Sequence, residues 1–259
     1  MLDVEFAHCT DTGRVRQHNE DFLGHVSPAT PAEMRSRGWL FALADGVGGQ
    51  EAGEIASRTA VESVIEGFGK SLPAELLPAL LRRLVQNANE RVYSAGRNMS
   101  TTIVACALRF DRAVVAHVGD SRCYLIRGGE AAPLTRDHTI VNEQIRLGVL
   151  STGEAASAAT RHMLSRSLGS DLFVNVDIGE HPVHPRDVLL LCSDGLHASV
   201  EPADMAAAVR DQANLEAAAQ KLTSLANERD GRDNISVQLI RVRAIERMGM
   251  YRGRPYKLR

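Results

Sequence analysis

The sequence predicts an α+β fold with largely antiparallel sheets, on three observations. Short runs of β-branched and apolar residues, bounded by glycine, aspartate or asparagine, recur along the chain and predict strands. Two longer segments in the first half repeat their apolar residues every three to four positions, which is typical of amphipathic helices. The strands and helices follow one another in groups rather than in βαβ alternation, which argues against a Rossmann fold.

In chain order, a strand over residues 39–44 comes first and two helices follow it. Apolar spacing predicts these helices over residues 52–68 and 75–95. The Gly-Lys-Ser-Leu-Pro sequence at residues 69–73 interrupts the pattern. Because the interruption is short, we expect the two helices to form an antiparallel pair.

The rest of the chain is predicted to hold five more strands and two more helices. The strands cover residues 102–110, 113–118, 123–127, 188–192 and 235–242, with a hairpin connection at residues 109–112. Asn214 is suited to cap a helix over residues 215–225, and Pro202 suits the first turn of a shorter one. Residues 151–161 are mostly small and polar, and we expect a mobile surface loop there.

Composition and charge exclude several classes of protein. The 259 residues are 44% hydrophobic and 24% charged, which is typical of a globular protein and excludes dominant disorder. The net charge of −2 and the 4% aromatic content argue against a nucleic-acid binder. The N-terminal residues include Asp3 and Glu5 and do not resemble a signal peptide, and the apolar runs are too short to span a bilayer.

The four cysteines indicate a reducing compartment. Cys9, Cys106, Cys123 and Cys192 lie far apart and form no CxxC pair, which argues against a zinc ribbon or a thioredoxin-like site. Three of them lie inside apolar runs. We therefore interpret them as reduced core residues and expect a cytoplasmic protein.

Aspartates stand at the ends of several predicted strands. Asp45 directly follows one strand, Asp120 and Asp194 follow two others by two residues, and Asp233 precedes the last. Each alone fits ordinary turn chemistry, but carboxylates gathered at one edge of a sheet repel one another unless a cation neutralises them. Oxygen ligands favour Mg²⁺ or Mn²⁺ over zinc. The pattern therefore predicts a site for one of these ions.

Six short motifs stand in a fixed order along residues 3 to 242. Residues 11–21 read Asp-Thr-Gly-Arg-Val-Arg-Gln-His-Asn-Glu-Asp, and residues 44–49 read Ala-Asp-Gly-Val-Gly-Gly. The later ones are Val-Gly-Asp-Ser-Arg at residues 118–122, Asp-His at 137–138, Leu-Cys-Ser-Asp-Gly at 191–195 and Asp-Asn-Ile-Ser at 233–236. Together they resemble the motifs of the bacterial metal-dependent (PPM, type 2C) serine/threonine protein phosphatases.

The resemblance implies a four-layer α/β/β/α sandwich, in which helix pairs flank two antiparallel sheets and a two-metal site lies at one end. It implies a catalytic domain over residues 1–242, with a flap at about residues 140–168, and a tail over residues 243–259. Residues 241–259 hold seven basic residues and one acidic residue. The tail is therefore either a solvated, disordered extension or a docking segment for an acidic partner or a membrane surface.

The resemblance also implies the residues that hold the two metal ions. Asp45 would bridge both ions, and the carbonyl oxygen of Gly46 would bind one of them. Asp194 and Asp233 would bind the other.

Other acidic residues would support these ligands. Asp21 would act mainly through metal-bound water, with Glu20 beside it and Asn234 next to Asp233. Asp120 matches the aspartate that holds a third, weaker ion in bacterial relatives.

The implied chemistry is direct hydrolysis. Two cations lower the pKa of a bridging water, and the resulting hydroxide attacks phosphorus in line. Arg16 would hold the phosphate with its planar guanidinium, so Arg16 and Asp45 are the predicted catalytic residues. Some family members have a histidine shortly after the second motif as general acid, but residues 47–50 are Val-Gly-Gly-Gln here. We interpret His18 and His138 as structural, so the proton would come from a metal-bound water or from another histidine.

These features predict a Mn²⁺- or Mg²⁺-dependent protein phosphatase that reverses a bacterial Ser/Thr kinase. We expect phosphorylated proteins as partners, no nucleic acid, and a monomer. A pseudophosphatase that only binds phosphoproteins is one alternative, and the presence of all four ligand aspartates argues against it. A metal hydrolase of another kind is a second, and the absence of histidine ligands argues against that. The flap is either a solvated loop or a substrate-selecting element.

Overall fold

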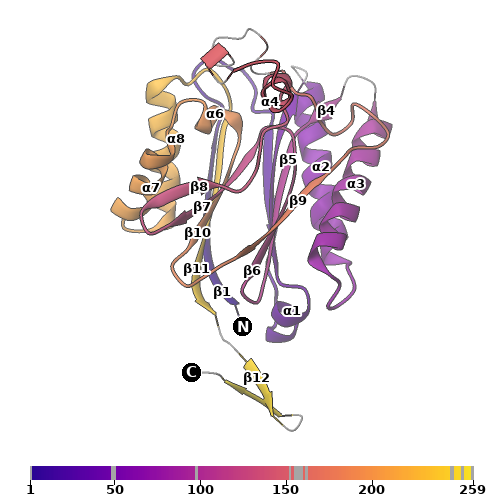
Figure 1. The fold of residues 1–259 in the computed structure, drawn as a ribbon, viewed down its shortest axis with the longest axis vertical. Coiled ribbons are helices and arrows are strands. Elements are labelled where there is room, and N and C mark those ends of the chain that lie inside the picture. The colour runs from indigo at the N-terminus through magenta and orange to yellow at the C-terminus, as the bar shows by residue number, and fades with distance from the viewer. Residues whose placement is uncertain are drawn as a thin grey trace.

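The computed structural model describes residues 2–47, 51–96, 99–151, 153, 154, 160, 163–245, 248–251 and 254–257. Within these residues, two antiparallel sheets pack face to face and helices cover the outer face of each (Figure 1). The predicted four-layer α/β/β/α sandwich is therefore confirmed. Most of the predicted loop at residues 151–161 lies outside the described residues.

The first sheet has six strands, and α2 and α3 cover it. Its order is β2-β3-β5-β6-β9, with the short β4 paired to the end of β3. The strands are β2 (Asp21–Val26), β3 (Trp39–Val47), β4 (Ser100–Thr101), β5 (Ile103–Arg109), β6 (Arg112–Val118) and β9 (Asp177–Pro182). The helices are α1 (Pro31–Ser36), which links β2 to β3, α2 (Glu51–Gly69) and α3 (Leu77–Ala95).

The second sheet has five strands in the order β1-β11-β10-β7-β8, and α7 and α8 cover it. The strands are β1 (Leu2–Asp11), β7 (Arg122–Arg127), β8 (Glu130–Pro133), β10 (Val188–Cys192) and β11 (Ile235–Ile245). The helices of this half are α4 (Ile140–Arg146), α6 (Asp194–His197), α7 (Pro202–Asp211) and α8 (Leu215–Arg229). Asn214 caps α8 as predicted, since its side chain accepts a hydrogen bond from the Ala217 N–H.

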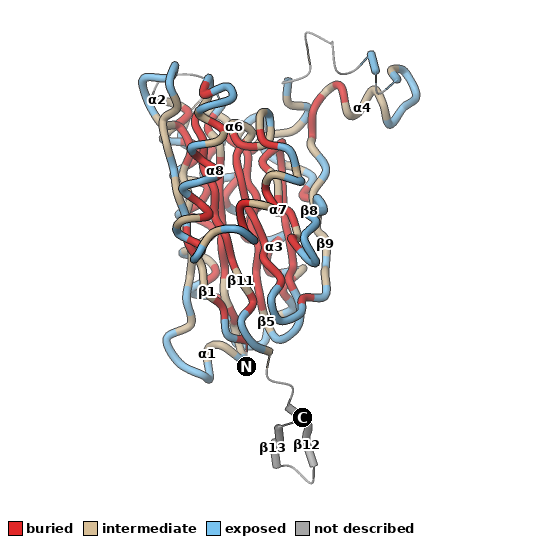
Figure 2. Tube along the Cα trace, turned by 90° about the vertical axis from the view of Figure 1, so that its left-hand side faces the viewer, coloured by how far each residue is buried: buried red, intermediate tan, exposed pale blue. Residues whose placement is uncertain are grey.

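Three apolar cores lie between the four layers. Along β3, Leu40, Ala42 and Ala44 face the helices, whereas Phe41 and Leu43 face the other sheet. This alternation follows from the two-residue period of a strand. Strands buried on both faces need apolar residues at every position, which is why they form continuous apolar runs in the sequence (Figure 2).

The predicted elements all occur, with small shifts at their ends. The hairpin at residues 109–112 joins β5 to β6, with Phe110 at a φ of 57°. Six strands and helices of the sandwich besides the short β4 and α6 were not predicted from the sequence, namely β1, β2, β8, β9, α1 and α4. Strand β11 continues to Ile245, beyond the predicted end of the domain at residue 242, and the tail forms a hairpin of β12 (Met248–Tyr251) and β13 (Arg254–Lys257).

The antiparallel pairing brings the predicted motifs to one end of the sandwich. Asp21 at the start of β2 pairs with Asp45 near the end of β3. Asp11 at the end of β1 pairs with Ile235 at the start of β11, and β10 ends beside the same part of β11. No helix among the described residues is long and apolar enough to cross a membrane.

Candidate metal and phosphate site

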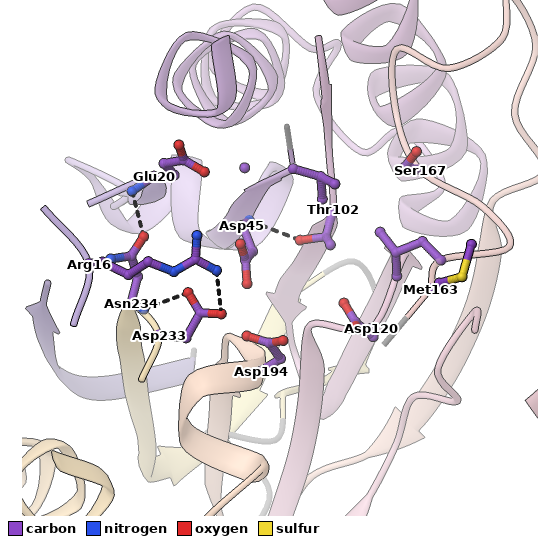
Figure 3. A pocket seen from close by; sticks show the side chains of 13 residues that line it. Arg16, Glu20, Asp45, Thr102, Asp120, Met163, Ser167, Asp194, Asp233 and Asn234 are labelled. Atoms are coloured by element: carbon purple, nitrogen blue, oxygen red, sulfur yellow. Dashed lines mark hydrogen bonds and ion pairs between the residues drawn. The ribbon is translucent and has the colours of Figure 1, made fainter. Parts of the chain in front are cut away.

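A cavity of ≈ 480 Å³ lies at this end of the sandwich (Figure 3). All the predicted site residues except Asp21 line it, namely Arg16, Glu20, Asp45, Gly46, Asp120, Asp194, Asp233 and Asn234. The remaining lining residues are Val47, Thr102, Met163, Leu164 and Ser167. Residues 48–50, which follow the second motif, lie outside the described residues.

Asp45 lies near the end of β3, and both its backbone N–H and its backbone carbonyl are hydrogen-bonded. Its N–H donates to the Thr102 Oγ1 at 2.9 Å, and its carbonyl accepts from the Thr102 N–H at 2.9 Å and from the Thr101 hydroxyl at 2.7 Å. These bonds fix the backbone, and the carboxylate points into the cavity (Figure 3). Burial raises the pKa of Asp45 well above its ordinary value, and the charge of Asp21 raises it further.

Gly46 is required because α2 packs directly on the strand at this point. A Cβ at residue 46 would overlap the backbone carbonyl of Gly53. Gly53 in turn packs against the side chain of Glu20, and the Gly46 N–H donates to the Glu20 carbonyl at 3.1 Å. The two glycines therefore let β3, α2 and the opening motif meet at the cavity.

Asp21 lies behind the cavity wall and is buried. Its Oδ2 accepts from the Ser193 hydroxyl at 2.7 Å, while its Oδ1 is buried without a hydrogen-bond partner among the described residues. Burial raises the pKa of Asp21 to about 7, the charges of Asp194 and Asp233 add to this, and hydrogen bonds from Ser236 and Ser193 oppose it. A buried carboxylate oxygen without a partner is expected where a cation or its water completes the site.

Asp120 is held from both sides. His138 makes two hydrogen bonds to Gly119, the residue before Asp120. Its ring Nδ1 accepts the Gly119 N–H at 3.2 Å, and its backbone N–H donates to the Gly119 carbonyl at 2.9 Å. His197 Nε2 bonds the Asp120 carbonyl at 3.0 Å. Gly119 has a φ of 103°, which favours glycine. The predicted structural role of His138 is confirmed, and burial raises the pKa of Asp120 to about 7.

Asn234 holds the loop that carries the opening motif. Its Nδ2 donates to the carbonyls of Thr12 and His18 at 2.9 Å each, and its Oδ1 accepts from the Glu20 N–H at 2.8 Å. One buried amide thus ties both ends of the segment that contains Arg16. This gives a physical basis for the supporting role predicted for Asn234.

Arg16 lies at the edge of the cavity and pairs with Asp233. Its Nη2 donates to the Asp233 Oδ2 at 2.8 Å, with the two side chains 47% and 37% exposed. The other Asp233 oxygen accepts from the Asn234 N–H at 2.9 Å. Arg16 was predicted as a phosphate ligand and Asp233 as a metal ligand, and their pairing with each other was not predicted.

The donor set at this end fits hard divalent cations. It consists of carboxylate and carbonyl oxygens, and Figure 3 shows Asp45, Asp194 and Asp233 directed toward a common space with Asp120 beside it. The pKa values of Asp21, Asp45 and Asp120 are raised, so their negative charges are costly without a counterion.

A second group with metal-binding side chains consists of His117, His138 and Asp177, and His138 bonds it to Gly119, the residue before Asp120. The two imidazole rings are stacked, with centroids 4.6 Å apart and planes tilted by 19°. Nearly parallel stacked rings cannot both direct an in-plane nitrogen at one ion. Asp177 already pairs with Arg166 at 2.9 Å and with the His138 Nε2 at 3.2 Å. Asp177 is therefore held by the Arg166 guanidinium and lies against the His138 ring, and this group is not the predicted metal site.

Five cavity residues were missed by the sequence analysis. Met163, Leu164 and Ser167 come from the segment predicted as the flap, so the sequence signal for them was their position in that segment. Thr102 was predicted only as the first residue of a strand. Its role in binding Asp45 follows from the register of β3 against β4 and β5, which the sequence does not encode locally.

Comparisons with known proteins agree with this geometry. A family model described as protein phosphatase 2C matches residues 14–229. The serine/threonine phosphatase stp of Listeria innocua is 34% identical over 254 residues, which cover 95% of this chain and 96% of the relative.

Solved structures are similar over almost the whole chain. The S. agalactiae serine/threonine phosphatase superposes with a TM-score of 0.86 at 35% identity, covering 93% of this chain and all of that one. The catalytic domain of the serine/threonine protein phosphatase PstP, solved with 2 manganese ions, has a TM-score of 0.80 at 29% identity and covers 94% of this chain and 100% of that one.

Proposed function

The chain belongs to the protein phosphatase 2C family, and from this premise we propose that it removes phosphate from phosphoserine and phosphothreonine in proteins, with Mn²⁺ or Mg²⁺ as its cofactor. The observation that carries this function is the cluster of carboxylates with raised pKa values beside Arg16, at the end of the sandwich. Oxygen ligands of this kind, without histidine, suit these two ions.

We propose that Asp45, the Gly46 carbonyl, Asp194 and Asp233 hold two ions. Asp120 would hold a third, and Asp21 would support them from behind the cavity wall. When bound, the ions lower the pKa of water and offset negative charge on the phosphoryl group. The hydrogen bonds to the backbone of Asp45 support its assignment, because they fix the direction of its carboxylate.

Arg16 would orient the phosphate. A guanidinium has five N–H donors, and Arg16 gives Asp233 one hydrogen bond, through Nη2. It can therefore contact a phosphoryl oxygen while it remains paired with Asp233. Its position at the cavity edge and its partial exposure support this role.

Water is the proton source that we propose for the leaving alkoxide. No histidine is among the described residues that line the cavity. His18 is exposed, and both ring nitrogens of His138 face partners, the Gly119 N–H and Asp177. A metal-bound water, which the sequence analysis left as one of two options, fits this arrangement.

The function is tested by hydrolysis of a phosphothreonine peptide with added Mn²⁺, with Mg²⁺, and with EDTA. We expect turnover only with an added metal ion. Asp45→Asn is the matched variant, because it keeps the size of the side chain and removes its charge. Binding of the phosphopeptide without turnover, under every metal condition, would favour the pseudophosphatase instead.

We further propose that the substrates are phosphorylated by a cognate Ser/Thr kinase, and that the protein acts as a monomer in the cytoplasm. The four free cysteines, three of them buried, support a reducing compartment. All three apolar cores are formed by buried residues of one chain, which supports a monomer. Light scattering of the protein as it elutes from a size-exclusion column tests the oligomeric state, and we expect the mass of one chain.

A further inference from the structure

A second cavity, of ≈ 650 Å³, adjoins the first. The two cavities share Arg16, Asp120, Asp194 and Asp233, so they open into each other around the same side chains. A peptide whose phosphate enters the first cavity can therefore reach the second with the residues on one side of the phosphate. The groups that line the second cavity are then placed to contact the residues that flank the phosphorylated one.

Most charges around the second cavity are already satisfied. Arg122 makes two hydrogen bonds to Asp137, at 2.8 and 2.7 Å, and a third to the Tyr124 hydroxyl at 2.8 Å. Asp233 pairs with Arg16. Asp120 and Asp194 belong to the carboxylate cluster. These groups have little capacity left for a substrate side chain.

Two described residues of this cavity have guanidinium N–H donors to spare, Arg16 and Arg232. Arg16 is the proposed ligand of the phosphate itself, which leaves Arg232 for a neighbouring group. Only the Nε of Arg232 has a partner among the described residues, the Asp230 Oδ1 at 3.0 Å, and its side chain is 80% exposed. The other N–H donors of its guanidinium face water. A planar fork of N–H donors is suited to a carboxylate or a phosphoryl group.

The loop that carries Arg232 is fixed to the rest of the site. The Gly231 carbonyl accepts from the Arg14 N–H at 2.7 Å, and the Gly231 N–H donates to the Ala226 carbonyl at 3.1 Å. The Arg14 Nε donates to the Asn227 carbonyl at 2.8 Å. Arg232 is also the residue directly before Asp233, so its backbone has a set position relative to the first cavity.

We propose that Arg232 is a specificity-determining residue that binds a second anionic group of the phosphopeptide. That group is a glutamate or aspartate side chain, or a further phosphoryl group, close to the residue that is dephosphorylated. The inference rests on the proposed phosphatase function and gives it a substrate class, acidic phosphopeptides.

The test uses a set of phosphothreonine peptides in which one flanking residue is alanine, glutamate or phosphoserine. This variable residue is placed in turn at each position on both sides of the phosphothreonine. The measured quantity is the ratio of kcat/KM for the acidic peptide to that for the alanine peptide. We expect a ratio of about two to five at the best position, because an exposed ion pair contributes modestly. The ratio should fall as salt is added. The glutamate and phosphoserine arms distinguish the two sources of the anion.

Three variants test whether Arg232 causes the preference for the acidic peptide. Arg232→Ala should bring the ratio to one, and Arg232→Lys should keep part of it, since an ammonium retains the charge without the fork. Asp230→Asn should raise the ratio, because it removes the acidic group that competes for Arg232. Arg210→Ala is the matched control: Arg210 is also exposed and pairs through its Nε with a nearby aspartate, Asp211, but it lies on α7 and lines neither cavity.

A wild-type ratio of one at every position, or a ratio that Arg232→Ala leaves unchanged, overturns the inference. In either case, metal-dependent turnover of the alanine peptide would leave the proposed function intact. If no peptide is hydrolysed with added metal, the proposed function itself fails.

Discussion

Arg16 is the residue whose position has the clearest consequence for catalysis. It pairs with Asp233, and both are partly exposed at the cavity edge. Arg16→Ala should lower kcat/KM about tenfold to somewhat over a hundredfold, or about 1.5–3 kcal/mol, because the phosphate loses a charged hydrogen-bond donor. Arg16→Lys should recover part of this.

The same variant should bind Mn²⁺ at least as well as wild type, because it removes a cation that competes with the metal for Asp233. Calorimetric Mn²⁺ titration and phosphopeptide kinetics of the three proteins check both expectations. A loss of metal affinity as large as in Asp45→Asn would make Arg16 a structural support of the ion site rather than a phosphate ligand.

His138 makes a pH-dependent contribution to stability. Burial, followed by the charge of His117, lowers its pKa from 6.5 to about 4, against the opposing effect of Asp177. The folded state therefore prefers the neutral ring, whose Nδ1 accepts the Gly119 N–H. This contribution is complete above pH 6.5, the pKa of the unfolded state, and is lost as the pH falls toward 4.

His138→Asn keeps an acceptor at the position of Nδ1 and does not titrate. We expect its free energy of unfolding to fall less than that of wild type between pH 6.5 and pH 4, by at most about 3 kcal/mol. Denaturant unfolding at several pH values measures this. Parallel curves for the two proteins would show that the protonation of another group dominates.

The sequence could predict the site residues because each ligand stands in a short motif at a strand end. Asp45, Asp120, Asp194 and Asp233 were found in this way, and the cavity brings them together. The pairing of Arg16 with Asp233 and the contact of Thr102 with Asp45 join residues far apart in the chain. Such contacts depend on the tertiary register, which no local pattern contains.

At the scale of elements, the contact between β3 and α2 leaves no room for a side chain at residue 46. A Cβ on residue 46 would overlap the Gly53 backbone, which cannot move away like a flexible side chain. Gly46→Ala should therefore destabilise the fold by about 1–3 kcal/mol, as overpacked positions do, and should also lower activity by displacing the residue 46 carbonyl.

Gly69→Ala, at the end of α2, is the control. Nothing lies within 4 Å of a Cβ built there, so we expect stability to be unchanged or slightly raised. Thermal unfolding and phosphopeptide turnover of both variants check this. Equal stability of Gly46→Ala and wild type would mean that α2 can shift without cost.

The elements found from sequence are those buried on both faces or strongly amphipathic. Strand β10 is an uninterrupted apolar run, and α3 has a regular apolar stripe. Among the described residues, strand β9 (Asp-Ile-Gly-Glu-His-Pro) pairs only with β6, and none of its own residues is fully buried. It therefore has no apolar pattern to detect. In β2, Gly24 packs against Ile65 of α2 and interrupts the pattern.

At the scale of the whole molecule, the pairing of β1 with β11 sets where the domain ends. Leu2 pairs with Ile245, and the buried Val242 pairs with Val4 and bonds Arg186 and Asp187 through its backbone. Within the described residues, β12 and β13 pair only with each other. We therefore propose residue 245 rather than residue 242 as the end of the catalytic domain.

A chain that ends at Ile245 should keep the thermal stability and the metal-dependent turnover of the full chain. A chain that ends at Val242 should lose stability, because it removes the β11 residues that pair with Leu2 and Asp3 and removes Ile245 from the core between the sheets. Thermal unfolding of the two shortened chains decides between the boundaries. If both are as stable as the full chain, the last part of β11 contributes little.

The whole sandwich also depends on the charge balance at its metal end. Without cations, the folded state holds Asp21, Asp45 and Asp120 at this end, where burial and the charges of neighbouring aspartates raise their pKa values. Mn²⁺ at about a hundred times its Kd should stabilise the fold by about 2.7 kcal/mol. For a chain of this size, that corresponds to a rise in Tm of about 5–10 °C, and EDTA should reverse it.

Asp45→Asn separates metal binding from a general effect of salt on stability. The variant removes one of the repelling charges, so in EDTA it should be at least as stable as wild type, yet Mn²⁺ should raise its Tm much less. Asp211→Asn, at an exposed position on α7, is the control and should respond to Mn²⁺ as wild type does. Thermal unfolding of the three proteins, with EDTA and with Mn²⁺, gives the answer. If Mn²⁺ raises the Tm of Asp45→Asn as far as that of wild type, Asp45 does not hold the ion, and the other carboxylates of the cavity would hold it.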